Sequence, residues 1–131
     1  MVGYPSRQGQ GMGSRVLVVD DDPDILDALS EILEVEGYQV DRARNGREAL
    51  QRLEQAPPDL VLLDLMMPVM DGWEFARSLG PDARPPIIVL SADRNVSAKA
   101  REIGALGWLA KPFELSELLA AVRRAVPPGT P

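Results

Sequence analysis

The stretch VLLDLMMPVMDG, from Val61 to Gly72, defines the fold more clearly than any other part of the sequence. An apolar run leads into a single carboxylate, Asp64, and two methionines, a proline and a turn-like Asp-Gly pair follow it. An apolar run without polar residues at alternate positions is typical of a strand buried on both faces of a parallel sheet. We therefore predict a buried strand over 60–65, and its terminal carboxylate requires an explanation.

The rest of the chain repeats this unit, because apolar runs alternate with helical patterns from residue 15 to residue 126. Strands that each precede a helix predict an α/β fold with a parallel, doubly wound five-stranded sheet of the (βα)5 type. The apolar runs predict strands at 15–20, 38–43, 60–65, 86–91 and 107–111, and the intervening patterns predict helices at 23–37, 45–56, 72–80, 93–105 and 115–126.

Composition limits the chemistry of the protein. The 131 residues fit one domain, and the chain has neither cysteine nor histidine. Disulfides, thiolate metal sites and histidine bases are therefore excluded, and any metal must be a hard ion bound by oxygen. A net charge of -6 makes direct nucleic-acid binding unfavourable, because phosphate contacts require clustered lysine and arginine.

Both ends of the chain differ from the middle in composition. Residues 1–14 are rich in glycine, serine and glutamine, which predicts a flexible N-terminal tail, and residues 127–131 predict a C-terminal tail or the start of a linker. The predicted domain is 15–126. The sequence has no apolar run of membrane-spanning length and no recognisable signal peptide, so a cytoplasmic location is expected. Whether the first residues are native, and whether an effector domain follows in a longer protein, stays open.

Polar residues collect where the predicted strands end. Asp20 and Asp21 follow the first strand, Asp64 ends the third, Ser91 the fourth and Lys111 the fifth. Because ligand sites in such sheets lie beyond the carboxyl ends of the strands, these side chains are expected to converge.

Each of these residues also has an ordinary structural explanation. Asp20 and Asp21 could simply be acidic residues enriched at a helix start, where the helix dipole favours anions. Asp22 before Pro23 is a good helix N-cap, and Asp64 could cap the turn that follows it. Ser91 could be a simple strand-end hydroxyl and Lys111 a surface lysine. The coincidence of all of them at one edge favours a site.

Clustered carboxylates repel one another, so without a cation one or more of them should take up a proton or destabilise the fold. Mg²⁺ prefers oxygen ligands and completes its coordination with substrate phosphate. A carboxylate beside Mg²⁺ and an ammonium group can attack a phosphoryl group, because both negative partners are screened.

These motifs, in this order and spacing, resemble the receiver domain of bacterial two-component response regulators, the CheY-like superfamily. The resemblance covers about residues 15–126 and implies a flavodoxin-like sheet with strand order 2-1-3-4-5. It depends on VVDDDP at 18–23, on D-x-x-x-P-x-x-x-G from Asp64 through Pro68 to Gly72, on SA at 91–92 and on KPF at 111–113.

The resemblance implies that Asp64 is the phospho-acceptor, receiving a phosphoryl group from a phosphohistidine of a sensor histidine kinase or phosphotransfer protein, or from a small acyl phosphate. The implied cofactor is Mg²⁺, for which Mn²⁺ could substitute. Its implied ligands are Asp20, Asp21, Asp64 and the backbone carbonyl of Met66.

The remaining motif residues are assigned by the same resemblance. The implied phosphate-binding groups are Lys111, Ser91 and the backbone of Ala92. The implied residues of the conformational switch are Ser91 and Trp108. The switched surface, formed by helix 93–105, strand 107–111 and helix 115–126, would bind a downstream effector or a second copy of the chain. The structural positions are Pro68, Gly72 and Pro112, the last after a cis peptide bond.

Two departures from the family pattern, and two further residues near the site, leave parts of this picture open. Ser91 replaces the more usual threonine, and Trp108 replaces the commoner tyrosine or phenylalanine, so its ring has less freedom to turn. Met66 could shield the acyl phosphate from water, whereas Asp93 could position water, so the phosphoryl lifetime stays undetermined.

The main hypothesis is therefore a signalling module that accepts phosphate and is not a true enzyme. One alternative is a receiver-like docking or dimerisation module that is not phosphorylated. A second is an aspartate-nucleophile phosphatase, which usually carries another acid where this chain has Met66 and also needs a cap domain. The kinase, the pathway and the oligomeric state cannot be read from the sequence.

Overall fold

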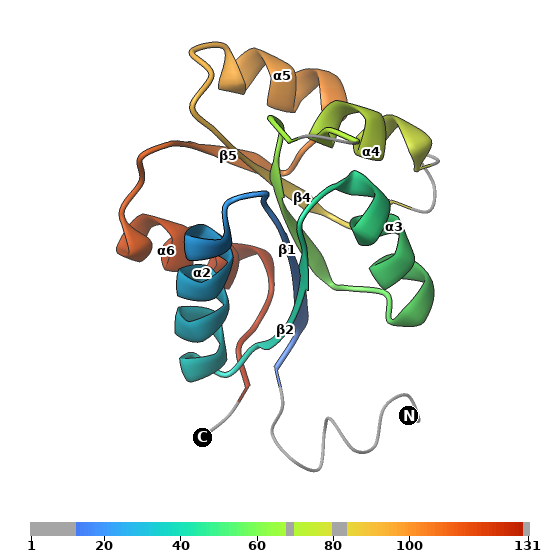
Figure 1. Ribbon diagram of the computed structural model, residues 1–131. Coiled ribbons are helices and arrows are strands. Elements are labelled where there is room, and N and C mark those ends of the chain that lie inside the picture. The colour runs from blue at the N-terminus through green and yellow to red at the C-terminus, as the bar shows by residue number, and fades with distance from the viewer. Residues whose placement is uncertain (1–12, 68–69, 80–83, 130–131) are drawn as a thin grey trace.

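The computed structural model describes residues 13–67, 70–79 and 84–129 and contains one five-stranded parallel sheet (Figure 1). The strand order is β2-β1-β3-β4-β5, so the predicted doubly wound (βα)5 fold and its strand order are confirmed. The strands are β1 Arg15–Val19, β2 Gln39–Ala43, β3 Leu60–Asp64, β4 Ile87–Ser91 and β5 Gly107–Ala110. The helices are α2 Pro23–Val35, α3 Gly46–Gln55, α4 Gly72–Ser78, α5 Val96–Ile103 and α6 Leu115–Ala125.

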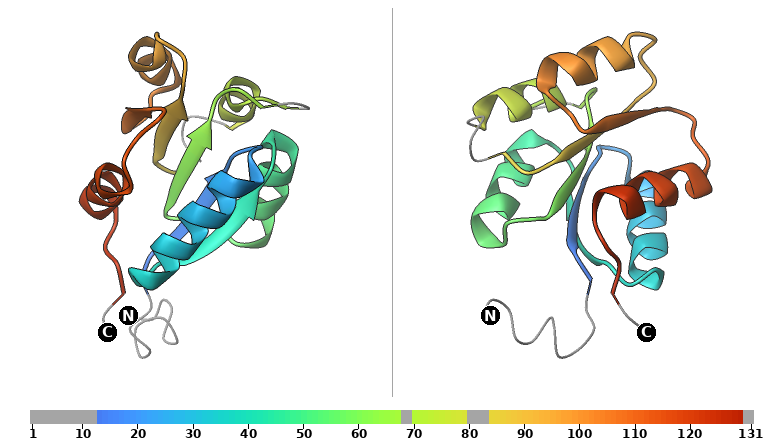
Figure 2. Two further views of the ribbon diagram at one scale, coloured as in Figure 1. Left: turned by 60° about the vertical axis from the view of Figure 1, so that its left-hand side comes forward. Right: turned by 180° about the vertical axis from the view of Figure 1, so that it is seen from behind.

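The sheet separates two apolar cores. Seen from behind, α2 and α6 lie on one side, while α3 and α4 lie on the other (Figure 2). One core joins the sheet to α2 and α6 through residues such as Leu29, Leu33 and Leu118, and the other joins it to α3, α4 and α5 through residues such as Ala49, Phe75 and Ala100. Every residue of β3 and β4 is buried, which explains the uninterrupted apolar runs that precede Asp64 and Ser91.

The central position of β3 determines what surrounds Asp64. In the register of the sheet, Val19 pairs with Leu63 and Asp64 pairs with Leu90. The residue after β1 is Asp20, so the carboxyl end of β3 has the end of β1 on one side and the end of β4 on the other. The order reverses between β1 and β3, and at such a switch point an α/β sheet opens a crevice for ligands.

Several elements are shorter than their sequence patterns suggested. The helix expected over 93–105 begins at Val96, because the backbone N–H of Asn95 donates to Asp93 Oδ1 at 2.7 Å in a turn before the helix. The helix expected to reach residue 37 ends at Val35, where Glu36 caps it and Gly37 takes a positive φ of 97°. Side-chain and glycine turns thus set both boundaries.

The hydrogen-bonded part of the domain reaches Gly13 and Gly129, beyond the expected limits of 15 and 126. The Ser14 hydroxyl donates to the Pro127 carbonyl at 3.0 Å, and the Gly37 carbonyl accepts from both Gly13 N and Gly129 N. Gly13 and Gly129 therefore meet at the pole opposite the carboxyl ends of the strands (Figure 1). Within 13–67, 70–79 and 84–129, no helix has the length and apolarity to cross a membrane.

Candidate functional site

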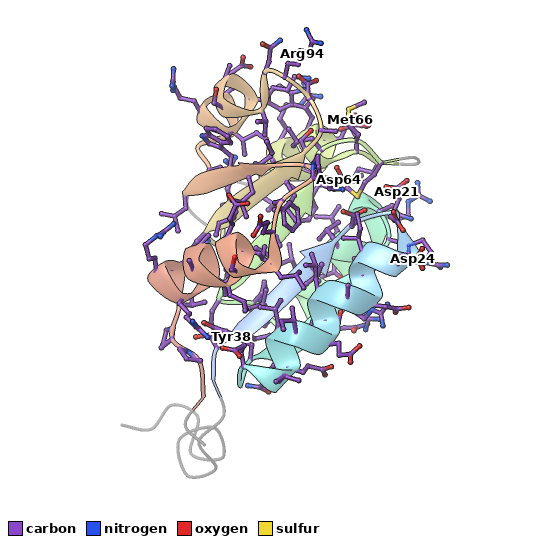
Figure 3. The ribbon with its side chains drawn as sticks, turned by 90° about the vertical axis from the view of Figure 1, so that its left-hand side faces the viewer. Asp21, Asp24, Tyr38, Asp64, Met66 and Arg94 are labelled. Carbon is purple, nitrogen blue, oxygen red and sulfur yellow. The ribbon has the colours of Figure 1, made fainter. Side chains whose placement is uncertain are left out.

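Three aspartates meet at the carboxyl edge of the sheet. Carboxylate oxygens of Asp20, Asp21 and Asp64 all lie within 4.8 Å of one another. Asp20 and Asp64 are buried at the ends of β1 and β3, whereas Asp21 is exposed on the loop to α2. Figure 3 shows Asp21 and Asp64 at the same end of the molecule. Asp64 follows Asp20 by 44 residues and Asp21 by 43 residues in the sequence, and the parallel pairing of β1 with β3 brings the three side chains together.

A single ammonium group faces two of these carboxylates. Lys111 Nζ donates to Asp20 Oδ2 at 2.7 Å and lies 3.6 Å from Asp64 Oδ2. Burial lowers the pKa of Lys111, but the hydrogen bond and charge of Asp20, together with the charge of Asp64, outweigh burial and raise the pKa above its ordinary value. Lys111 therefore stays a cation at neutral pH and compensates the buried Asp20.

The negative charge of Asp64 is less well neutralised than that of Asp20, because Lys111 Nζ lies farther from it. Burial raises the pKa of Asp64 to about 6, the neighbouring Asp20 adds to the rise, and the hydrogen bond from Met66 N to Oδ1 at 3.1 Å opposes it. At pH 7 the carboxylate is largely ionised while poorly solvated, which is a favourable state for a nucleophile.

The cluster fits a hard divalent cation. Counted by formal charge, three carboxylates and one ammonium group leave two negative charges, which a divalent ion would balance. All side-chain donors are oxygens, as Mg²⁺ prefers, and the exposed position of Asp21 leaves one side open to water and phosphate.

Gly72 occupies a position at which the fold requires glycine. Its N–H donates to the Leu65 carbonyl at 3.2 Å, and a Cβ here would lie 2.5 Å from the Asp64 carbonyl oxygen. The N-terminus of α4 therefore packs directly on the backbone that carries Asp64. Pro68 lies outside the described residues.

Ser91 and Lys111 are linked through their backbones at the ends of β4 and β5. Lys111 N donates to the Ser91 carbonyl at 2.8 Å, and the Lys111–Pro112 peptide bond is cis. Ser91 is fully buried, and its Oγ accepts from Asp93 N at 3.1 Å. Ala92 is exposed directly after it.

Two further residues singled out from the sequence are Trp108, which is partly exposed on β5, and Asp22, which caps α2. Trp108 pairs with Val89 in the sheet, but its side chain is 48% exposed, so much of the ring faces solvent. Asp22 is the N-cap of α2, because its side chain accepts from Asp24 N at 2.9 Å. Its own N–H donates to Asp20 Oδ1, which holds the buried carboxylate in place.

Two contacts around the site have no counterpart in the motifs. Asp93 Oδ2 lies 2.5 Å from Lys99 Nζ on α5, and Gly46 N donates to the Met70 carbonyl at 2.8 Å. A spacing of six residues does not by itself indicate an ion pair, so the first contact depends on the turn before α5. The second contact joins the start of α3 to the chain before α4, two segments that sequence patterns do not relate.

Fold and site together define an α/β domain with an acidic, lysine-containing centre at the switch point of its sheet. The family model described as the response regulator receiver domain matches residues 16–123, and the chain belongs to this family. Such domains are the receivers of two-component systems, and the acidic cluster fits phosphorylation and Mg²⁺ binding.

Relatives and solved structures agree with this assignment. "Response regulator MprA" of Mycolicibacterium vanbaalenii is 44% identical over 125 residues, which cover 92% of this chain and 53% of that protein. The chemotaxis response regulator CheY4 of Vibrio cholerae has a TM-score of 0.78 at 35% identity, covering 86% of this chain and 98% of the other. The receiver domain of DrrB, described as activated by BeF3, has a TM-score of 0.76 at 32% identity, with coverages of 86% and 97%. The chain spans about half the length of curated relatives such as MprA.

Proposed function

We propose that this chain is a phosphorylation-dependent switch in which Asp64 accepts a phosphoryl group from a phosphohistidine of a histidine kinase or phosphotransfer protein. The observation that carries the proposal is the position of Asp64, buried between the Lys111 ammonium group and two further carboxylates within 4.8 Å. This role is that of a signalling phospho-acceptor with only weak self-phosphorylation and self-dephosphorylation.

In the proposed reaction, a carboxylate oxygen of Asp64 attacks the phosphorus atom. The bond between phosphorus and the donor imidazole nitrogen breaks, and the nitrogen keeps the electron pair. Lys111 is close enough to Asp64 Oδ2, at 3.6 Å, to contact phosphoryl oxygens bound there, and its raised pKa keeps it charged. Met66 N holds Asp64 Oδ1, which leaves Oδ2 as the attacking atom.

Asp20, Asp21, Asp64 and the backbone carbonyl of Met66 are the proposed ligands of Mg²⁺, or of Mn²⁺ in its place. When bound, the ion supplies charge neutralisation for the meeting of a carboxylate with a phosphoryl group. The charge balance of the cluster supports this choice, because its two uncompensated negative charges match a divalent ion.

Ser91, the Ala92 N–H and Trp108 form the proposed switch. Aspartyl phosphate adds charge and acceptor oxygens, to which the Ser91 hydroxyl and Ala92 N–H would donate. The loop after β4 would then move inward, and Trp108 and the surface of α5, β5 and α6 would change with it. A downstream effector or a second copy of the chain would bind the changed surface.

The phosphoryl donor is proposed to dock at an apolar groove beside Lys111. The groove encloses about 400 Å³ between α2 and the chain entering α6. Its walls are formed by Ile25, Leu29, Phe113 and Leu115, and Lys111 lies on its lining. An amphipathic helix that carries a phosphohistidine could place its apolar face here and its phosphoryl group at Asp64.

The proposal is tested by incubating the chain with Mg²⁺ and a small acyl phosphate and measuring the intact mass. Wild type should gain a phosphoryl group, and a metal chelator should prevent the gain. Asp64→Asn should gain nothing, whereas the matched control Asp27→Asn, at an exposed carboxylate on α2, should react like wild type. Equal phosphorylation of Asp64→Asn and wild type would refute the assigned acceptor.

A further inference from the structure

The loop between β4 and α5 is tied to the body of the protein by a chain of three contacts. Ser91 Oγ accepts from Asp93 N at 3.1 Å, and Asp93 Oδ1 accepts from Asn95 N at 2.7 Å. Asp93 Oδ2 pairs with Lys99 Nζ at 2.5 Å. In Figure 3, Arg94 marks this loop at the same end of the molecule as Asp64 and Met66.

The ion pair in this chain is partly shielded from water. The Lys99 and Asp93 side chains are only 27% and 25% exposed, whereas Arg44 in the pair with Glu48 is 73% exposed. The Lys99 hydrogen bond, followed by the bond from Asn95 N, lowers the pKa of Asp93. Asp93 is thus held as a carboxylate whose two oxygens are both engaged away from the acceptor.

Both ends of the loop are fixed. On one side, Ser91 is the last residue of β4, and its carbonyl accepts from Lys111 N at 2.8 Å. On the other side, Val96 and Ala100 of α5 are buried in the core, so Lys99 projects from a packed helix. Movement of the Ser91 hydroxyl and Ala92 toward Asp64 would change the path of the chain between these two anchors, and would therefore disturb the pairing of Asp93 with Lys99.

We propose that Lys99, acting through Asp93, is a positioning residue that holds the 91–95 loop in the conformation without phosphate. The strength of this pair sets how readily Ser91 and Ala92 reach a phosphoryl group on Asp64. The inference rests on the proposed function, because it concerns the regulation of the same site. Lys99 makes no contact with the acceptor, so its effect is confined to the equilibrium of the loop.

The test is a calorimetric titration with beryllofluoride, a mimic of the phosphoryl group, in the presence of Mg²⁺. Lys99→Met removes the charge but keeps an unbranched side chain, and it should bind the mimic about threefold more tightly than wild type, because a contact made only in the unbound conformation is lost. Lys99→Arg restores a cation and should return the affinity to the wild-type value. Arg44→Met removes a more exposed ion pair outside the 91–95 loop and should leave the affinity unchanged.

A double-mutant cycle separates positioning from general destabilisation. Asp93→Asn alone should tighten binding as Lys99→Met does, and the double variant should show no further gain, because both changes break one contact. Affinity for Mg²⁺ alone should stay at the wild-type value in Lys99→Met, which a disturbed site would not allow.

The outcomes distinguish this inference from the proposed function. If wild type binds beryllofluoride but Lys99→Met binds it equally or more weakly, the role of Lys99 is refuted and the acceptor site stands. If wild type binds none of the mimic in the presence of Mg²⁺, the proposed function and the inference both fail.

Discussion

At the scale of single residues, the features that make Asp64 the proposed phospho-acceptor also lower the stability of the folded protein. It is 4% exposed, lies beside two other carboxylates, and has only part of the Lys111 ammonium group as a counter-charge. Its pKa rises from 3.8 to about 6, mainly because of burial. The folded protein therefore disfavours the ionised form of Asp64, the carboxylate that we propose as the phospho-acceptor.

Replacing Asp64 by asparagine should stabilise the metal-free protein in a pH-dependent way. The folded state holds the proton up to about pH 6, whereas the unfolded chain releases it near 3.8, so stability is lost as pH rises between these values. Asp64→Asn should raise the free energy of unfolding by on the order of 3 kcal/mol above pH 7 and by little below pH 4.

Urea unfolding in a metal chelator at the two pH values measures this difference. Adding Mg²⁺ at pH 7.5 should stabilise wild type more than Asp64→Asn, because the ion relieves the repulsion in wild type. The same gain from Asp64→Asn at both pH values would show that burial does not disfavour the Asp64 charge.

Ser30 offers a second test at the residue scale. Its side chain is buried on α2, and its Oγ is one of two buried side-chain polar atoms without a hydrogen-bond partner within the described ranges. Ser30→Ala removes this unsatisfied group and improves helix propensity, so it should stabilise the protein by about 1 kcal/mol. A lower melting temperature for Ser30→Ala would mean that the hydroxyl has a partner.

At the scale of elements, α2 connects the site to the fold through its first residues. Asp22 caps the helix with its side chain, and its N–H holds the Asp20 carboxylate at 2.9 Å. The side chain of Asp22 thus caps α2, while its backbone N–H positions the Asp20 carboxylate at the site.

Asp22→Ala should lower the free energy of unfolding by about 1 kcal/mol, because one helix N-terminal N–H loses its acceptor. Asp22→Ser keeps a capping oxygen and should recover most of this loss. The rise in melting temperature caused by Mg²⁺ should be the same in all three proteins. A weaker response to Mg²⁺ in Asp22→Ser would instead indicate that the carboxylate contributes to ion binding.

Element types and their order could be predicted from the sequence, because buried parallel strands leave uninterrupted apolar runs. Element ends were less accessible, as α5 shows, since an Asp93 side-chain turn delays its start by three residues. The convergence of Asp20, Asp64 and Lys111 followed from the rule that parallel strands end at one edge. The Asp93–Lys99 pair could not be predicted, because it depends on the path of a loop.

At the scale of the whole molecule, Gly13, Gly129 and the turn after α2 form one contact at the pole opposite the site. Gly13 N and Gly129 N both donate to the Gly37 carbonyl, and the Tyr38 hydroxyl donates to the Val126 carbonyl at 2.9 Å. Figure 3 shows Tyr38 at this pole, far from Asp64. The chain entering β1 and the chain leaving α6 are therefore joined through the same turn.

Gly37→Ala should destabilise the protein by about 2 kcal/mol, because an alanine at φ 97° is strained and its Cβ would lie 2.9 Å from Gly129 N. Gly107→Ala is a matched control, since a Cβ there meets nothing within 4 Å. Thermal unfolding of both variants gives the comparison. Equal melting temperatures would show that the junction does not constrain the turn.

The account as a whole depends on Asp64 being the residue that forms the acyl phosphate. The most direct measurement is to phosphorylate the chain with a small acyl phosphate and Mg²⁺, reduce the product with borohydride, and locate the modified residue by peptide mass spectrometry. Reduction converts an aspartyl phosphate to homoserine, and we predict homoserine at position 64. Homoserine at Asp20 or Asp21 with none at 64, or an unmodified chain under these conditions, would contradict the account.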